Sequence, residues 1–328
     1  MLYELLDGIN TLSVIGMCKN AGKTTVLNSV IAECEARGER LGLTSIGRDG
    51  ERSDLVTNTK KPEIFVREGA VIATAETLLS EGDISMEILS STGIPTPMGD
   101  IIIVRARSAG FVQIGGASIT THQQRIRDEL FSFGCDRVLI DGAISRKSLG
   151  NPSLADGVIL SSGASYDPSI IKTVEDTAFI ARLFSLPECP ADAGSARFTA
   201  IRGEESDGGD DLNALVRFLK GGADTLVIRG AVTDSTAAAL TNIGKLLRNT
   251  RLVFEDASRL LLRAANFEKL LRFIGGAAVL KGTRLIAVTV NPFSAYGMHY
   301  DRSEFKERVE AALERAGIET PVIDVRYV

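Results

Sequence analysis

The sequence of 328 residues contains little cysteine and little histidine, and it has no long apolar run. The four cysteines are scattered and form no Cys-x-x-Cys pair, so their spacing indicates neither a zinc site nor a disulfide framework. The two histidines, His122 and His299, lie far apart without neighbours that resemble metal ligands. No apolar stretch approaches the roughly 18 residues that cross a bilayer, so we expect no membrane partner.

A strong charge of either sign is also missing. The formal net charge is -5 at pH 7 with acidic and basic residues intermixed, which argues against a general nucleic-acid surface. The first residues include Glu4 and Asp7 but no basic stretch, so we expect no secretory signal. Together these features predict a cytoplasmic protein, and the length suits two domains.

The most informative segment that is present is Gly16–Thr25, which reads Gly-Met-Cys-Lys-Asn-Ala-Gly-Lys-Thr-Thr. An apolar strand pattern at 11–16 precedes its loop, and a helical pattern at 23–37 follows it. This is the layout of a P-loop, where backbone N–H groups and a helix N-terminus surround a phosphate. We expect Lys23 to reach the β- and γ-phosphates and the Thr24 hydroxyl to bind Mg²⁺. The predicted nucleotide-binding residues are Lys19, Asn20, Ala21, Gly22, Lys23, Thr24, Thr25 and, further along the chain, Gly142.

The loop departs from the usual P-loop spacing. Met17 stands where a glycine is expected, and Gly16 comes one residue early. Cys18 lies near a helix N-terminus and Lys19, where the pKa of a thiol can fall, although a small filler residue is the simpler interpretation. The alternative for the whole segment is an ordinary strand-to-helix turn with a threonine at the helix start.

Apolar strand patterns alternate with helical patterns, which predicts an α/β fold with a mostly parallel sheet and helices on both faces. Pro187 and Pro190 mark a linker, so we place a nucleotide-binding domain at 1–190 and a C-terminal α/β domain of unknown role at 191–328. The second half either forms its own layer or extends the first sheet. Expected strands are 40–46, 100–104, 111–114, 137–142, 157–162, 198–202, 225–229, 251–254, 285–290 and 322–325, and expected helices are 69–80, 121–133, 168–184, 211–220, 235–248, 266–274 and 302–316.

The strand pattern at 138–141 ends in a carboxylate, Asp141. At the carboxyl edge of a parallel sheet, Asp141 would hold Mg²⁺ directly or through a water. Gly142 would let the backbone approach the γ-phosphate closely. The alternative is an aspartate that serves only the turn.

Two charged loops are expected at the same edge of the sheet. In the first, Asp49 would bind Mg²⁺, orient a water or act as a base, and Arg48 would bind an anionic group of a substrate. In the second, Arg146 and Lys147 would contact substrate or phosphate. For both loops, the alternative is a solvated segment with compensating charges. The predicted catalytic residues are Lys23, Asp49 and Asp141, and the predicted metal ligands are Thr24, Asp141 and Asp49.

Three further segments follow predicted strands and contain small or aromatic residues. Ser161–Ser165 is a candidate for a base or substrate pocket, and Gln113–Ser118 for a substrate contact. Asn291–Gly297 is a candidate for capping an adenine or recognising a partner. An ordinary turn is the alternative for each segment.

The combination of Gly22–Thr25, Arg48–Asp49 and Leu139–Gly142 resembles the SIMIBI class of P-loop NTPases. That class includes dethiobiotin synthetase, molybdopterin-guanine dinucleotide biosynthesis adaptors and metallochaperone NTPases, and the resemblance covers about the first 180 residues. It implies Mg-nucleotide at the strand ends and commonly a homodimer. Lys19 lies one position later than the signature lysine of the class, so it receives no trans-acting role. The whole layout is also faintly similar to accessory ATPases of cobalamin-dependent amino acid mutases.

These features predict a Mg²⁺-dependent ATPase that acts as an accessory or maturation factor for a partner protein. ATP is favoured because no Asn-Lys-x-Asp guanine signature occurs at a suitable place, and GTP stays an alternative. Hydrolysis is expected to be slow alone and faster with the partner. One rival hypothesis is a small-molecule kinase or ATP-dependent ligase that acts on an anionic substrate. Another is a non-catalytic binding module that responds to nucleotide.

Overall fold

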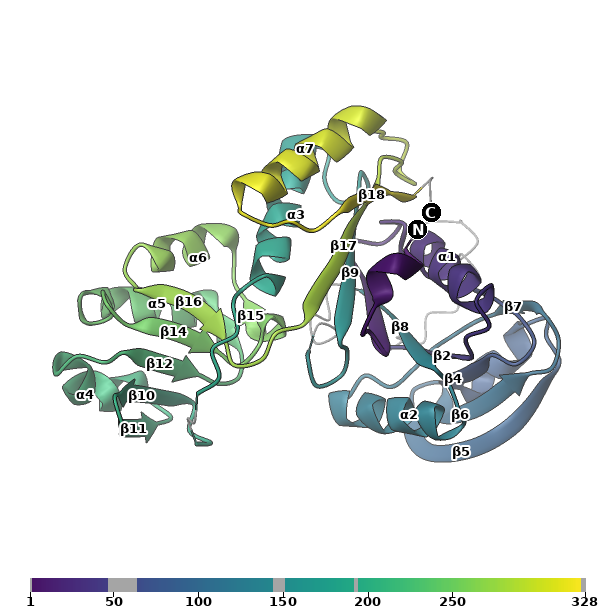
Figure 1. The fold of residues 1–328 in the computed structure, drawn as a ribbon, viewed down its shortest axis with the longest axis horizontal. Helices are drawn as coiled ribbons and strands as arrows, with labels where there is room; N and C mark the ends of the chain where they lie inside the picture. Colours follow the sequence, from purple (N-terminus) through teal and green to yellow (C-terminus); the bar gives the residue numbers. More distant parts are fainter. Residues whose placement is uncertain (1, 47–63, 144–150, 192–193, 326–328) are drawn as a thin grey trace. The chain divides into compact units, whose positions relative to one another are not determined.

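The computed structural model describes residues 2–46, 64–143, 151–191 and 194–325 (Figure 1). Contacts divide the chain into two units, of which the first comprises residues 1–177 and 285–328 and the second residues 178–284. This division differs from the boundary expected near residue 190, because the C-terminal segment returns to the first unit.

The first unit contains a large mixed sheet, in which nine strands are described. In order across the sheet they are β18 (Val322–Asp324), β17 (Arg284–Asn291), β9 (Gly157–Gly163), β1 (Thr11–Gly16), β8 (Arg137–Ala143), β2 (Leu41–Ser45), β4 (Val71–Ala75), β6 (Gly99–Ala106) and β5 (Met86–Thr96). Strand β1 is parallel to both of its neighbours, β8 and β9, and β2 is parallel to β8 and β4. At the β4–β6–β5 end of this sheet the strands pair antiparallel. The expectation of an α/β fold with a mostly parallel sheet is therefore confirmed.

Helices cover both faces of this sheet. Leu41 and Leu43 on β2 share a hydrophobic core with Val26 and Leu27 of α1 (Lys23–Glu35). Between them, Gly42 faces the other side, where a Cβ atom placed on it would lie 3.1 Å from Cβ of Leu130 in α2 (Thr120–Ser132). Because successive residues of a strand point to opposite faces, α1 and α2 lie on opposite faces of the sheet.

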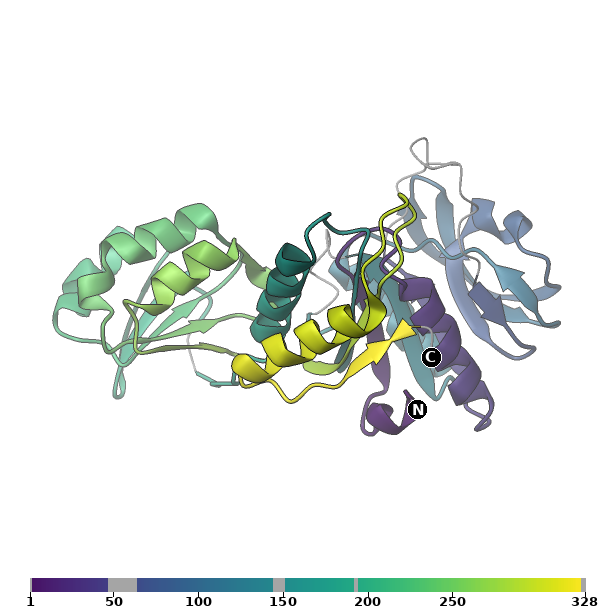
Figure 2. The same ribbon diagram turned by 90° about the horizontal axis from the view of Figure 1, so that it is seen from above.

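The C-terminal segment extends the first sheet. Strands β17 and β18 pair in parallel at its edge, and α7 (Arg302–Arg315) packs beside β18 (Figure 2). The residues from Ala287 to Val290 are fully buried, as expected for a strand covered on both faces. The shorter elements of this unit are η1 (Tyr3–Leu6), β3 (Ile64–Val66), η2 (Glu76–Glu81) and β7 (Gly110–Val112).

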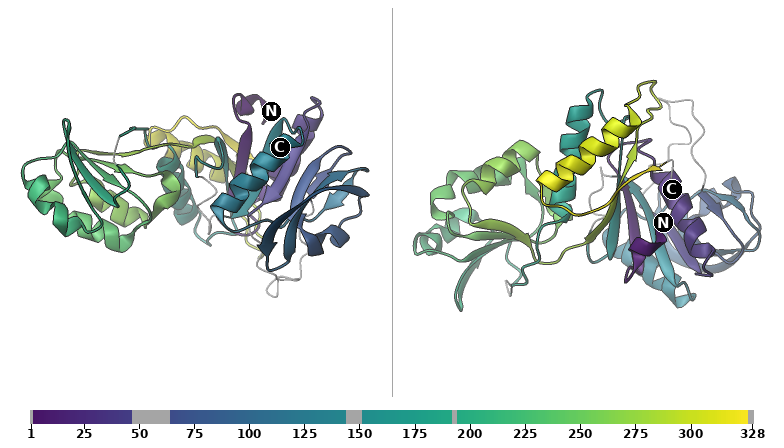
Figure 3. Two further views of the ribbon diagram at one scale, coloured as in Figure 1. Left: turned by 90° about the horizontal axis from the view of Figure 1, so that it is seen from below. Right: turned by 45° about the horizontal axis from the view of Figure 1, so that its top comes forward.

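The second unit has its own sheet and core. Its strands are, in order, β11 (Glu205–Gly209), β10 (Phe198–Arg202), β12 (Thr225–Ile228), β14 (Arg251–Phe254) and β16 (Gly276–Val279). Helices α5 (Asp234–Asn242) and α6 (Ala264–Leu271) pack against each other (Figure 3). Phe254 and Phe267 are fully buried, with ring centroids 6.5 Å apart. The remaining elements are η4 (Leu212–Leu215), α4 (Val216–Lys220), β13 (Val232–Thr233), η5 (Gly244–Leu246), η6 (Ala257–Arg259) and β15 (Leu260–Leu261).

One helix has residues in both units. Helix α3 spans Ile170–Phe184, and the division falls between Thr177 and Ala178. Its later residues belong to the core of the second unit, where Phe179 packs on Phe267 with 5.9 Å between ring centroids.

The helix expected at 69–80 is wrong. The structure instead has strand β4 followed by the short 3₁₀ helix η2. The residues Val71–Ala75 are fully buried between β2 and β6, and a run that includes valine, isoleucine and threonine suits a buried strand. Most other expected elements appear within a few residues of their predicted bounds. Across the described ranges, no helix is long and apolar enough to cross a bilayer.

Candidate phosphate-binding site

The predicted phosphate loop connects the central strand β1 to helix α1. The strand ends at Gly16, the helix begins at Lys23, and six residues turn the chain between them. Gly22 has a φ of 93° and Asn20 a φ of 61°, in the left-handed region that favours glycine and asparagine. The first N–H groups of α1 have no intrahelical acceptor and carry the positive end of the helix dipole. The local geometry is therefore a strand–loop–helix connection, a type of connection whose helix N-terminus can accept an anion.

Lys23 bends back over the end of β1. A Cβ atom placed on Gly16 would lie only 2.6 Å from Cδ and 2.7 Å from Cγ of Lys23. The aliphatic part of Lys23 therefore occupies the space that any larger residue at position 16 would need. This explains the early glycine in the loop, since the residue beneath the lysine is Gly16 and not residue 17.

Met17 is accommodated because its side chain is buried away from solvent. Its exposed fraction is 5%. Its backbone N–H donates to the carbonyl oxygen of Ser161 on β9 at 2.8 Å. The Thr177 hydroxyl on α3 lies 3.0 Å from its sulfur. Met17 thus continues the sheet pairing of β1 and anchors the start of the loop.

The ends of neighbouring strands brace the loop from one side. The side-chain amide of Asn291, the last residue of β17, donates to the carbonyl oxygen of Asn20 at 3.0 Å. The carbonyl oxygen of Asn291 accepts from the N–H of Ala164 at 2.9 Å. A Cβ atom on Gly22 would approach Cγ1 of Val325 to 2.9 Å. The sequence placed Asn291 in a candidate loop but did not predict its bond to Asn20. The only feature of the sequence that pointed to such a role was an asparagine at the end of an apolar strand.

Asp141 lies on the strand next to the loop and on the face where α1 packs. It is opposite Val14 in the β1–β8 register, and Ala143 is opposite Gly16. Residues that are opposite each other in parallel strands share a face. Val14 and Leu139 lie in the same core as the α1 side chains, so the carboxylate of Asp141 lies on that face, near the strand end. Gly142 is opposite Ile15 and therefore belongs to the other face.

The predicted site residues differ in exposure. Ala21 is buried, whereas Gly22, Lys23 and Thr24 are partly exposed. Lys19, Asn20 and Thr25 are exposed. The structure brings the loop, Lys23, Thr24 and the Asp141 strand to one edge of the sheet. Four further predicted residues lie outside the described ranges, namely Arg48, Asp49, Arg146 and Lys147. Within the part of the chain that is described, no group of three or more His, Cys, Asp and Glu side chains is arranged to hold a metal.

The thiol of Cys18 does not have the lowered pKa that its position near a helix N-terminus allowed. Burial raises the pKa of Cys18 to about 11, although the charge of Lys23 acts in the opposite direction. At neutral pH the thiol is therefore protonated. This finding favours the simpler interpretation of a small residue that fills the loop.

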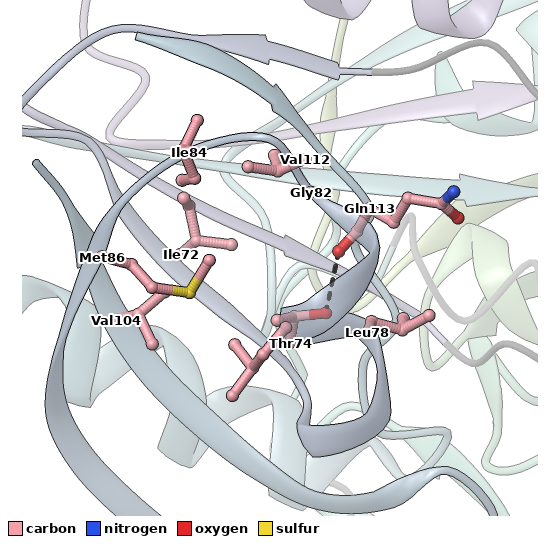
Figure 4. A pocket seen from close by; sticks show the side chains of 10 residues that line it. Ile72, Thr74, Leu78, Gly82, Ile84, Met86, Val104, Val112 and Gln113 are labelled. Carbon is pink, nitrogen blue, oxygen red and sulfur yellow. Dashed lines mark hydrogen bonds between the residues drawn. The ribbon is translucent and has the colours of Figure 1, made fainter. Parts of the chain in front are cut away.

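The Gln113–Ser118 segment has a structural role at the end of β4. The Thr74 hydroxyl donates to the Gln113 carbonyl at 3.1 Å (Figure 4). It also accepts from the Gly115 N–H at 3.0 Å. Beside this contact, Ile72, Met86 and Val104 line an apolar cavity of about 10 Å³. Such a volume accommodates at most one water, so it is not a substrate pocket.

The other two candidate segments lie against each other. The Ser165 hydroxyl donates to the Ser294 hydroxyl at 3.3 Å and accepts from the Ala295 N–H at 3.4 Å. In the second segment, the ring of Phe293 packs against that of His299, with centroids 5.2 Å apart. The two segments therefore form one surface beside the phosphate loop, joined to it through Asn291.

Comparisons with known proteins identified no relative, since no family model, no curated protein and no solved structure matches the chain.

Proposed function

We propose that this protein binds a nucleoside triphosphate with Mg²⁺ at the β1–α1 loop and hydrolyses it slowly as an accessory factor for a partner protein. The observation that carries the proposal is the position of Lys23. Lys23 is the first residue of helix α1, and its Cγ, Cδ and Cε atoms lie over Gly16, so the side chain folds back toward the end of β1 where the loop begins. A helix N-terminus and a lysine at its first residue are complementary to a polyanionic phosphate chain.

The position of Asp141 supports binding of Mg²⁺ together with the nucleotide. Thr24 lies in the first turn of α1, and Asp141 lies on the same face of the adjacent strand. Hydroxyl and carboxylate oxygens are the ligands that Mg²⁺ takes, usually with several waters retained. Bound there, the ion would neutralise phosphate charge, while the loop and Lys23 orient the phosphates.

A partner is proposed because the second unit has its own sheet and hydrophobic core. The residues named around the phosphate loop all belong to the first unit. We propose that a partner protein docks on the second unit, which contributes none of these residues. ATP is the proposed nucleotide, and a second copy of the chain is the proposed oligomeric partner.

Titration calorimetry with ATP, GTP and ADP, each with and without Mg²⁺, tests the proposal. We expect Mg-ATP to bind the intact protein and Lys23→Ala to weaken that binding about 10- to 100-fold, as expected for loss of a charge-assisted hydrogen bond. Lys220→Ala, at an exposed lysine of α4 in the second unit, is the matched control and should bind normally. Absence of ATP and GTP binding at millimolar concentration with Mg²⁺ would overturn the proposal.

Phosphate release separates hydrolysis from binding alone. We expect slow release from the wild type and none above background from Lys23→Ala. Tight binding without any release, alone or with cell extract, would instead identify a binding module.

A further inference from the structure

Met17, Thr177 and Ser162 form a buried polar contact between the phosphate loop and helix α3. Thr177 and Ser162 are fully buried, and Met17 is 5% exposed. The Thr177 hydroxyl lies 3.0 Å from the Met17 sulfur and 2.7 Å from the Ser162 hydroxyl. Because Met17 occupies a position where the usual P-loop has glycine, this contact depends on the departure of the loop from the common pattern.

The Thr177 hydroxyl has more acceptors than protons. It lies 2.6 Å from the carbonyl oxygen of Thr173, one turn earlier in α3, as well as 3.0 Å from the Met17 sulfur. A hydroxyl carries one proton, so it donates fully to only one of these two acceptors at a time. When Ser162 donates to Thr177, the proton of Thr177 is left for either the helix carbonyl or the loop sulfur. A displacement of the loop therefore changes the hydrogen bonding inside α3.

A second contact also holds α3 in place. The Thr173 hydroxyl, one turn before Thr177 in this helix, lies 2.9 Å from the Tyr300 hydroxyl. Hydrogen bonds in a water-poor environment are stronger, and their loss is more costly than at a surface. The loop and α3 are therefore not independent in this part of the fold.

We propose that Met17 and Thr177 are positioning residues that couple phosphate binding at the loop to helix α3. The inference rests on the proposed nucleotide function and goes beyond it. Helix α3 continues past Thr177 into residues of the second unit, so a change in its hydrogen bonding is a change in an element common to both units. Nucleotide binding pulls the loop toward the phosphates, alters the Thr177–Met17 bond and slows amide exchange in α3.

Three substitutions separate the hydroxyl and the sulfur from side-chain volume. Thr177→Val keeps the shape but removes the hydroxyl, Thr177→Ser keeps the hydroxyl, and Met17→Leu keeps an apolar side chain but removes the sulfur acceptor. We expect Thr177→Val and Met17→Leu each to weaken Mg-ATP binding about two- to tenfold, as for one buried hydrogen bond, and Thr177→Ser to stay near the wild type. The double variant Met17→Leu/Thr177→Val should bind Mg-ATP about as tightly as the single variant with the lower affinity. Both substitutions remove the same contact, so their effects do not add.

Hydrogen exchange of peptides from 170–184, with and without Mg-ATP, gives the readout that a purely structural role would not change. We expect nucleotide to protect these peptides in the wild type and in Thr177→Ser but not in Thr177→Val or Met17→Leu at saturating nucleotide. If Thr177→Val or Met17→Leu folds and nucleotide protects its 170–184 peptides as much as in the wild type, the coupling is overturned. The proposed nucleotide function still stands in that case. If the wild type binds no nucleotide, both proposals fail together. If Thr177→Val does not fold, Met17→Leu decides the result.

Discussion

The contact between Gly16 and Lys23 provides the sharpest prediction. In Gly16→Ala, the new methyl carbon would lie 2.6 to 3.0 Å from three carbons of the Lys23 side chain. Carbon atoms without a bond normally rest about 3.5–4.0 Å apart, so the lysine stem must move by about 1 Å. The backbone of Gly16 is not in the left-handed region, so alanine is compatible with the main chain.

The expected result is a loss of affinity with little loss of stability. Displacing the ammonium group from a phosphate costs about 1.5–3 kcal/mol, the range for a charge-assisted hydrogen bond, which is about 10- to 100-fold in the dissociation constant. Lys23 is partly exposed and its end is free to move, so the strain of the added methyl stays near the lower limit for overpacking, about 1 kcal/mol, or roughly 2–4 °C in melting temperature.

Titration calorimetry with Mg-ATP and thermal unfolding measure these two effects separately. Gly282→Ala is the matched control, because there the methyl would approach the side chain of Glu188 at 3.2 Å or more, without the closer overlap found at Gly16. A double variant adds a second check. If alanine at position 16 acts through the lysine, Gly16→Ala/Lys23→Ala binds no worse than Lys23→Ala alone. Wild-type affinity in Gly16→Ala, or additive losses in the double variant, would refute the reasoning.

Three further predictions concern residues around the same loop. Asp141→Asn should retain the fold but lose the gain in ATP affinity that Mg²⁺ provides, as measured by calorimetry with and without the ion; an unchanged Mg²⁺ effect would contradict the assignment. Asn291→Ala removes the bond to the Asn20 carbonyl and should weaken ATP binding about two- to tenfold; equal affinity for wild type and variant would show that the brace does not matter. Alkylation of Cys18, followed by peptide mass mapping, should speed up about tenfold per pH unit between pH 7 and 10 because burial raises the pKa of this thiol to about 11. A rate that levels off below pH 9 would contradict that protonation state.

Local patterns in the sequence predicted most of the elements that build the site. Strand β1, helix α1 and strand β8 appear close to their expected bounds, because a buried apolar strand and an amphipathic helix have distinct residue periods. Placing Asp141 on the strand beside the loop followed from the same logic. The face on which its carboxylate lies required the register of β1 with β8.

Long-range pairing was beyond prediction from local patterns. The segment 69–80 looks helical in isolation, but β4 is a strand because β2 and β6 enclose it on both sides. Likewise, the local residue pattern of β17 does not predict whether this strand joins the first sheet or the sheet of the second unit. Strand partners lie far apart in the sequence, and the free energy of their pairing comes from burial against those partners.

The amino-acid sequence by itself determined the strand–loop–helix order, the glycine–lysine–threonine chemistry of the loop and the carboxylate near the end of β8, because these depend on residues that are close together in the chain. Only the tertiary structure decided that Lys23 lies over Gly16, that Met17 bonds to Thr177 and that Asn291 braces the loop. The last two contacts join residues more than 150 positions apart, and burial in the folded core is what brings such distant residues together.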